Sequence, residues 1–143
     1  MSEPGLEVFE STLQKTQLWL KDLAEAAHVD KPTAYKALRA VLHAIRDRLP
    51  VEEAAHFAAE LPLLIRGVYY EGWRPAATPV KFSRDEFLRV VQANIVSSEV
   101  IDPLRITRAV FEILNKHLAP GEIKHVLSVL PKELQALWPT PAR

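Results

Sequence analysis

The second half of this chain repeats the first half without a gap, and this duplication constrains the fold more than any other feature. When the sequence is shifted by 69 positions, identical residues coincide from Arg39 onward. The coinciding residues are Arg39-Ala40-Val41 with Arg108-Ala109-Val110, Leu49 with Leu118, Glu53 with Glu122, His56 with His125, and Leu61-Pro62 with Leu130-Pro131. A duplication predicts two similar units that pack through related faces. By itself it predicts no chemistry.

The spacing of apolar residues predicts helices along nearly the whole chain. A long first helix is indicated by an apolar stripe at alternating steps of four and three, which is the period of a helical face. The stripe consists of Phe9, Leu13, Thr16, Leu20, Leu23 and Ala27. A second helix is expected after Asp30, a residue type that caps helices, and Pro50 ends it because proline disfavours a helical residue before it. No segment alternates convincingly with the period of strands, so the sequence predicts an all-α fold.

The second half carries equivalent start signals. Ser83 and Glu86 form a Ser-x-x-Glu capping box, and Asp102-Pro103 is expected to begin the next helix. We therefore expect a single helical domain, 1–143, arranged as a bundle of two pseudo-symmetric repeats of about four helices each. Repeat one spans 5–70, a proline-broken linker spans 71–83, and repeat two spans 84–138. A chain of 143 residues buries enough surface to need no disulfide or metal for stability.

The two copies differ in side-chain size on the third helix of each unit. Ala54 and Ala58 stand where the second copy has Ile123 and Leu127. Small side chains let a neighbouring element approach closely, because less volume separates the two backbones. We therefore expect the long N-terminal helix to pack against Ala54 and Ala58.

Composition and charge exclude several classes of protein. Lys+Arg and Asp+Glu both number 18, and the resulting net charge of zero argues against general nucleic-acid binding. The chain has no cysteine, which excludes disulfides, thiolate catalysis and sulfur-ligated zinc and fits a cytoplasmic protein. The N-terminus lacks a signal-peptide pattern and no uncharged apolar run is long enough for a bilayer, so no membrane association is expected. The glycines form none of the usual phosphate-binding loops, and we predict no catalytic residues.

A Glu-x-x-His motif occurs once in each half, as Glu53/His56 and Glu122/His125. Residues three apart share a helix face, so each carboxylate and imidazole can address one point, as in di-iron helix bundles. In the alternative interpretation each glutamate stabilises the free N–H groups of the first helical turn, by about 0.3–1 kcal/mol. The expected helices are short and no matching glutamate stands on a partner helix, which favours the structural interpretation. We predict no cofactor, and the four residues are the ligands of the metal-binding alternative.

Arginines on the second helix of each unit are the remaining shared polar feature. Arg39 is expected to pair with Glu53, and Arg108 with Glu122, so that the second helix is tied to the third within each unit. The same helix carries further basic residues that we expect on its solvated side. This basic set is Arg39, Arg46 and Arg48.

Aromatic residues and arginines gather in the segment 66–75, which has no full counterpart in the second half. Tyrosine, tryptophan and arginine are enriched at the energetic hot spots of protein interfaces. The candidate contact residues are Arg66, Tyr69, Tyr70 and Trp73. In the alternative interpretation, Tyr69 fills a core position and Trp73 packs back as a clasp between the linker and the core.

Three parts of the chain resemble one known family. They are Arg39-Ala40-Val41-Leu42-His43-Ala44 with Arg46-Asp47-Arg48-Leu49-Pro50, the stretch from Leu61 to Trp73, and Leu130-Pro131-Lys132-Glu133-Leu134 with Leu137-Trp138. Together they are similar to the bacterial family named domain of unknown function 2267, and the stretch from Leu61 to Trp73 is the most specific part. The resemblance implies a small helical prokaryotic protein. It implies no activity and no catalytic residues.

The sequence therefore favours a non-enzymatic helical binding or scaffold module of the cytoplasm. Its expected partner is a protein, including a second copy of the chain, and nucleic acid is not expected. The alternative is a metal- or cofactor-binding helical bundle that uses the duplicated Glu-x-x-His pairs.

Overall fold

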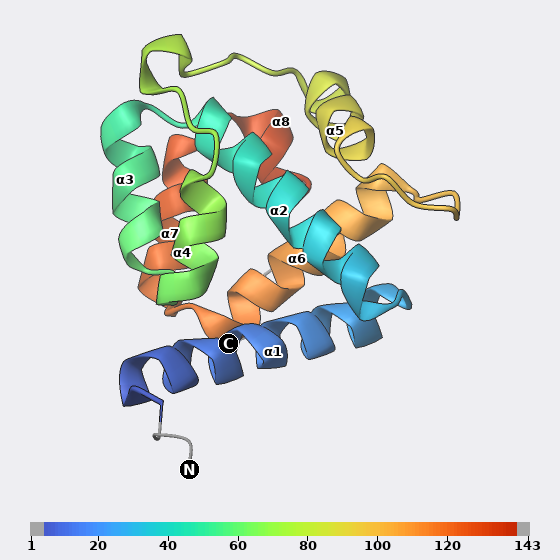
Figure 1. Cartoon of the computed structure of the whole chain (residues 1–143). Helices are drawn as coiled ribbons and strands as arrows, with labels where there is room; N and C mark the ends of the chain where they lie inside the picture. The colour runs from blue at the N-terminus through green and yellow to red at the C-terminus, as the bar shows by residue number, and fades with distance from the viewer. Residues whose placement is uncertain (1–4, 140–143) are drawn as a thin grey trace.

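A computed structural model of the chain describes residues 5–139, and over this range the protein is all-helical with no strand. The ends of the predicted domain, 1–4 and 140–143, lie outside the described residues. The described residues form eight α-helices and one short 3₁₀-helix, η1, and Figure 1 shows how the α-helices are arranged. Their bounds are α1 Glu7–Ala27, α2 Lys31–Arg48, α3 Val51–Ala59, α4 Leu63–Tyr70, η1 Pro75–Ala77, α5 Arg84–Ala93, α6 Pro103–His117, α7 Pro120–Val129 and α8 Lys132–Gln135. The predicted all-α class is confirmed.

Helix α2 lies at the centre of the molecule. It packs against α1, α3, α4, α5 and α6, which surround it in Figure 1. Four of its nine buried side chains are large and apolar, and four others are alanines that allow the neighbouring helices to approach. These alanines are Ala34, Ala37, Ala40 and Ala44. The core formed around α2 is continuous and includes residues from both halves of the chain.

The predicted helix starts are confirmed by their hydrogen bonds. The Asp30 side chain accepts from the backbone N–H of Thr33, and Asp102 accepts from the N–H that follows Pro103. Ser83 and Glu86 form the full capping box, in which each side chain accepts from the backbone N–H of the other. These bonds satisfy N–H groups that a helix cannot pair internally.

The first half of α1 differs from the prediction. Trp19, Leu23 and Ala27 are buried, but Phe9 and Leu13 remain 59% and 51% exposed. In Figure 1 this part of α1 passes beneath the lower end of α4. The apolar stripe of α1 therefore continues beyond the helices that cover it. Periodicity identifies the apolar face of a helix but does not show how far its partner helices extend.

The neighbour that fills the space beside the small residues of α3 is Tyr69, and the expectation of α1 at this position is wrong. The Tyr69 hydroxyl donates to the carbonyl oxygen of Ala54 at 2.8 Å, and its ring lies 5.8 Å from that of Phe57. Burial raises the pKa of the Tyr69 hydroxyl well above its ordinary value. Helix α1 packs instead against α2, α4 and α6.

Of the three arginines expected on the solvated side of α2, Arg46 is instead buried, because it closes the C-terminal end of α4. Arg46 is only 4% exposed, and its Nη1 donates to the carbonyl oxygens of Tyr69 and Glu71, each at 2.8 Å. The Arg46 guanidinium also pairs with Asp47 at 2.9 Å. Carbonyl groups at the end of a helix lack intrahelical partners, so a buried guanidinium is well suited to satisfy them.

His43 lies one turn before Arg46 and serves the same helix end. Its Nε2 lies 2.7 Å from the carbonyl oxygen of Val68, and since a carbonyl only accepts, Nε2 donates the proton. Burial lowers the pKa of His43, the bond to Val68 opposes this, and the charges of Arg46 and Arg39 lower it further. The neutral imidazole is therefore the form that the fold favours.

Replacing Arg46 by methionine should destabilise the protein by about 2–3 kcal/mol, because the buried carbonyl of Tyr69 and the partly buried carbonyl of Glu71 lose a charged donor while the apolar volume is nearly kept. The free energy of unfolding is measured by urea denaturation. Arg108→Met is the matched control, since Arg108 is exposed on α6, and it should change stability by less than about 0.5 kcal/mol. Equal losses in the two variants would contradict the role of Arg46.

His43 should make stability depend on pH in a defined direction. Its folded-state pKa lies below the ordinary value of 6.5, so below that pH the unfolded chain binds more protons than the folded chain. The stabilisation is complete above 6.5 and is lost as the pH falls toward the folded-state pKa. The free energy of unfolding should therefore fall more steeply toward acid pH in the wild type than in His43→Gln. His28→Asn, which changes an exposed histidine, should keep the wild-type slope.

Candidate functional site

The two Glu-x-x-His motifs meet across the interface between α3 and α7. His56 Nε2 lies 3.1 Å from a carboxylate oxygen of Glu122, and His125 Nε2 lies 2.7 Å from one of Glu53. The two imidazole rings lie 4.7 Å apart. The later residue of one motif contacts the earlier residue of the other, so the two helices run antiparallel, as Figure 1 shows. The four residues form one cluster, which we call the α3–α7 His/Glu cluster.

Helix starts place these side chains. Pro50 and Ala119 precede the first residues of α3 and α7, so each glutamate falls in the first turn and each histidine one turn later. Apolar side chains of the same helices, including Phe57 and Val126, are buried beneath the cluster. Both histidines remain about half exposed and both glutamates less so. The cluster therefore lies at the protein surface, with buried apolar side chains beneath it and solvent on its other side.

The arginine pairing expected from the sequence is wrong. Arg39 pairs with Glu71 at 2.7 Å, and this contact lowers the pKa of the Glu71 carboxyl. Glu53 pairs across the interface with His125 instead. The shared glutamates and histidines therefore connect one half to the other, and spacing within one half does not reveal such long-range partners.

Glu60 is a member of this region that the sequence analysis missed. His56, Glu60 and Glu122 each offer a ligand atom, and these atoms lie within 4.8 Å of one another. Glu60 stands four residues after His56, which is one helical turn along the same face. That spacing was the available signal. The dinuclear geometry of di-iron bundles needs ligands from four helices, whereas these three ligands come from α3 and α7 alone.

Some side chains of the aromatic segment 66–75 lie in the core, and others lie partly exposed on top of it. Arg66 Nε donates to the carbonyl of Ala58 at 3.0 Å, and its Nη2 donates to that of Leu61 at 3.0 Å, so its guanidinium closes the end of α3. Tyr69 is buried completely, and its side chain forms no part of the surface.

Tyr70 packs on Tyr69, and Trp73 packs on Tyr70. The ring of Tyr70 is 5.5 Å from that of Tyr69 and 5.3 Å from that of Trp73, and both outer rings are half-buried against the core. The indole N–H of Trp73 is buried without a hydrogen-bond partner among the described residues. Of the four candidate contact residues, Arg66, Tyr70 and Trp73 therefore reach the surface in part, while Tyr69 does not.

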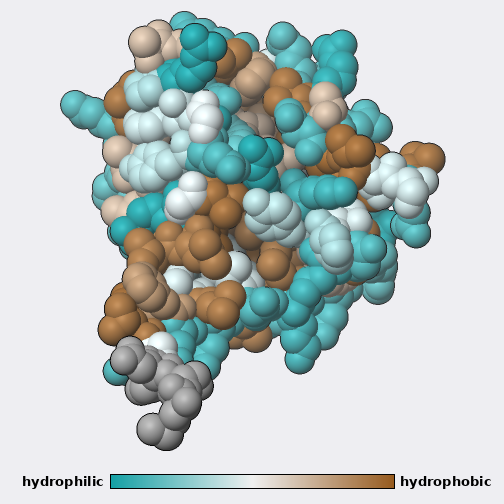
Figure 2. Space-filling view, in the orientation of Figure 1, coloured by the Kyte–Doolittle hydropathy of each residue, from teal (hydrophilic) through white to brown (hydrophobic). Residues whose placement is uncertain are grey.

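An apolar surface lies where α1 passes α4. Figure 2 shows apolar residues gathered over this part of the molecule. The two helices are joined there by Thr12, whose Oγ1 accepts from the backbone N–H of Leu64 at 2.9 Å. We define the α1–α4 apolar surface by its exposed members, which are Leu6, Phe9, Leu13, Leu63 and Leu64. Leu63 also lines an open hollow of about 480 Å³ with Leu18 and Arg66.

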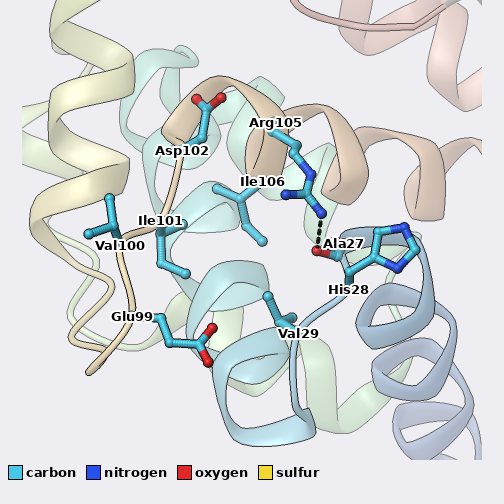
Figure 3. A pocket seen from close by; sticks show the side chains of 9 residues that line it. All are labelled: Ala27, His28, Val29, Glu99, Val100, Ile101, Asp102, Arg105 and Ile106. Carbon is cyan, nitrogen blue, oxygen red and sulfur yellow. Dashed lines mark hydrogen bonds between the residues drawn. The ribbon is translucent and has the colours of Figure 1, made fainter.

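A small pocket of about 80 Å³ lies where α1 ends, and Figure 3 shows its side chains. Arg105 reaches from α6 and donates to the carbonyl oxygen of Ala27 at 2.8 Å. At this point the chain turns through His28, which has a φ of 55°. The guanidinium of Arg105 thus satisfies a carbonyl group at the C-terminal end of α1. The pocket lies at this junction between α1 and α6.

The comparisons with known proteins establish the class of the protein. The profile of one family, described as an uncharacterized conserved protein (DUF2267), matches residues 16–137. The chain belongs to this family. A comparison with curated proteins found no match. Among residues 5–139, no helix has the length and apolar character needed to cross a membrane.

The pair between Glu53 and His125 should couple the two halves weakly but measurably. In a double-mutant cycle with Glu53→Gln and His125→Gln, we expect a coupling free energy of about 0.2–1 kcal/mol, because the pair is half exposed. The free energies of unfolding come from urea denaturation. A second cycle with Glu52→Gln, on the exposed side of α3, should give no coupling to His125. Equal coupling in both cycles would contradict a specific pair.

Proposed function

We propose that the protein is a non-catalytic scaffold module, made of two duplicated helical units, that self-associates through the α1–α4 apolar surface. The observation that carries this proposal is the exposure of Phe9 and Leu13 on a helix whose same stripe is buried further along. An exposed apolar surface of this kind marks an interaction site in a protein that is otherwise well packed.

The reciprocal contacts of the α3–α7 His/Glu cluster support the duplication. His56 contacts Glu122 just as His125 contacts Glu53, and these two contacts exchange when the chain is shifted by 69 positions. Contacts of this form, in which each partner uses the same patch, arise at a two-fold axis. We therefore interpret the α3–α7 interface as an internal copy of a dimer interface.

Equivalent hydrogen bonds at two helix ends support the same interpretation. Arg66 donates to the carbonyls of Ala58 and Leu61, and Gln135 donates to those of Leu127 and Leu130. Each residue of the first set stands 69 positions before its counterpart. The carbonyl groups at the ends of α3 and α7 thus accept equivalent side-chain hydrogen bonds, although the donor is arginine in one case and glutamine in the other.

A second copy of the chain is the partner that the α1–α4 apolar surface fits best. Two copies related by a two-fold axis would each cover the other's apolar stripe, because such an interface is self-complementary. The net charge of zero adds no long-range repulsion between copies. The surface also combines a projecting aromatic side chain, Phe9, with apolar neighbours on a second helix, which are features of interface cores.

Self-association is tested by measuring the mass of the full chain in solution over a concentration series. The chain mass is 16.1 kDa, and the average mass should rise toward twice this value with concentration. Phe9→Glu and Leu13→Glu should remain monomeric, because each places a charge in the proposed interface. Val100→Glu is the control, since Val100 is 98% exposed on a distant loop, and it should associate like the wild type.

Circular dichroism of each variant separates loss of association from loss of folding. The substituted side chains on α1 are already exposed, so the helical signal should be unchanged. A wild-type chain that stays monomeric at all concentrations would refute self-association, and so would equal effects of Phe9→Glu and Val100→Glu.

A further inference from the structure

The α3–α7 His/Glu cluster has the composition and spacing of a metal site. We propose that His56, Glu60 and Glu122 bind one divalent transition-metal ion, of which Zn²⁺ is the representative. The three residues offer ligand atoms within 4.8 Å of one another. This proposal does not depend on self-association, because the cluster lies on helices other than α1 and α4.

The distance between the first two ligands already suits zinc. His56 Nε2 and the Glu122 carboxylate oxygen are 3.1 Å apart. Two ligands of a tetrahedral zinc ion, with bonds of about 2.0–2.2 Å, lie about 3.3–3.6 Å apart. An ion can therefore replace the shared proton between imidazole and carboxylate with a movement of a few tenths of an ångström.

Glu60 supplies the third ligand from the same helix as His56. It caps the C-terminus of α3, directly after Ala59, and is exposed, so its carboxylate can turn toward His56 without disturbing the core. A histidine and a glutamate one turn apart on a helix form a chelating pair. Glu122 approaches from α7, and the half-exposed position of His56 leaves the fourth position to water.

The second half of the cluster lacks this third ligand. His125 and Glu53 form an equivalent pair, but Val129 stands 69 positions after Glu60, where the matching carboxylate would be. The side chain of Val129 packs against the core and offers no ligand atom. We therefore assign one ion per chain, on the side of His56.

The ligand set selects among metals. Imidazole nitrogen is a good ligand for zinc, copper and nickel, whereas magnesium and calcium are bound by oxygen atoms. The ion would join α3 to α7, and so one half of the chain to the other. A ligand that binds only the folded state stabilises it, so zinc should raise the melting temperature.

The test is calorimetric titration of the full chain with Zn²⁺ in a buffer that does not bind metal, together with thermal unfolding. The wild type should bind one equivalent of zinc and gain thermal stability, and Mg²⁺ should have no such effect. Glu60→Gln and His56→Gln should weaken zinc binding by about 10- to 100-fold or more, since loss of an outer partner alone has effects of that size.

Glu53→Gln is the matched control. It removes a carboxylate from the same cluster but not from the proposed ligand set, so one equivalent of zinc should still bind with affinity within a few-fold of the wild type. Glu60→Gln changes an exposed side chain, so its fold should be intact and its loss of binding specific. The proposal is overturned by a wild type that does not bind zinc, by unchanged binding in Glu60→Gln, by loss of binding in Glu53→Gln, or by half an equivalent that bridges two chains.

Discussion

Helix α2 packs against five other helices and buries half of its side chains, and the positions of most other helices follow from this packing. A buried helix can carry a charged residue only where the charge is satisfied, and Arg46 meets this condition because it faces the carbonyl end of α4. That contact fixes where α4 ends. Since Tyr69 lies in the last turn of α4, it also brings the tyrosine hydroxyl to α3, and the three helices become one packed unit.

The helices and their starts could be predicted from the sequence because the signals are local. Asp30, Ser83 and Asp102 act through bonds to residues only a few positions away. The exposure of Phe9 and the burial of Arg46 could not be predicted in this way. The exposure of Phe9 depends on how far the helices that cover α1 extend, and the burial of Arg46 depends on where α4 ends. The sequence next to Phe9 or Arg46 contains no signal for either.

Four members of the candidate site could be predicted from the sequence, but their pairing could not. The repeated spacing of Glu53 and His56, and of their counterparts in the second half, identified four residues that do lie together. Spacing along one helix shows which side chains share a face, but not which face of another helix they meet. The same limitation hid Glu60, because its relation to Glu122 exists only once α3 and α7 are side by side.

The reciprocal pairing of α3 with α7 has a consequence for how the two halves can change. In a true homodimer, one substitution alters both symmetric positions at once, so an asymmetric surface cannot evolve there. When both copies lie in one polypeptide, as in the proposed duplication, each position varies independently. Val129 stands 69 positions after Glu60 and has different chemistry. Under the proposed duplication, fusion of the two copies would permit such specialisation of one side while the other keeps its packing.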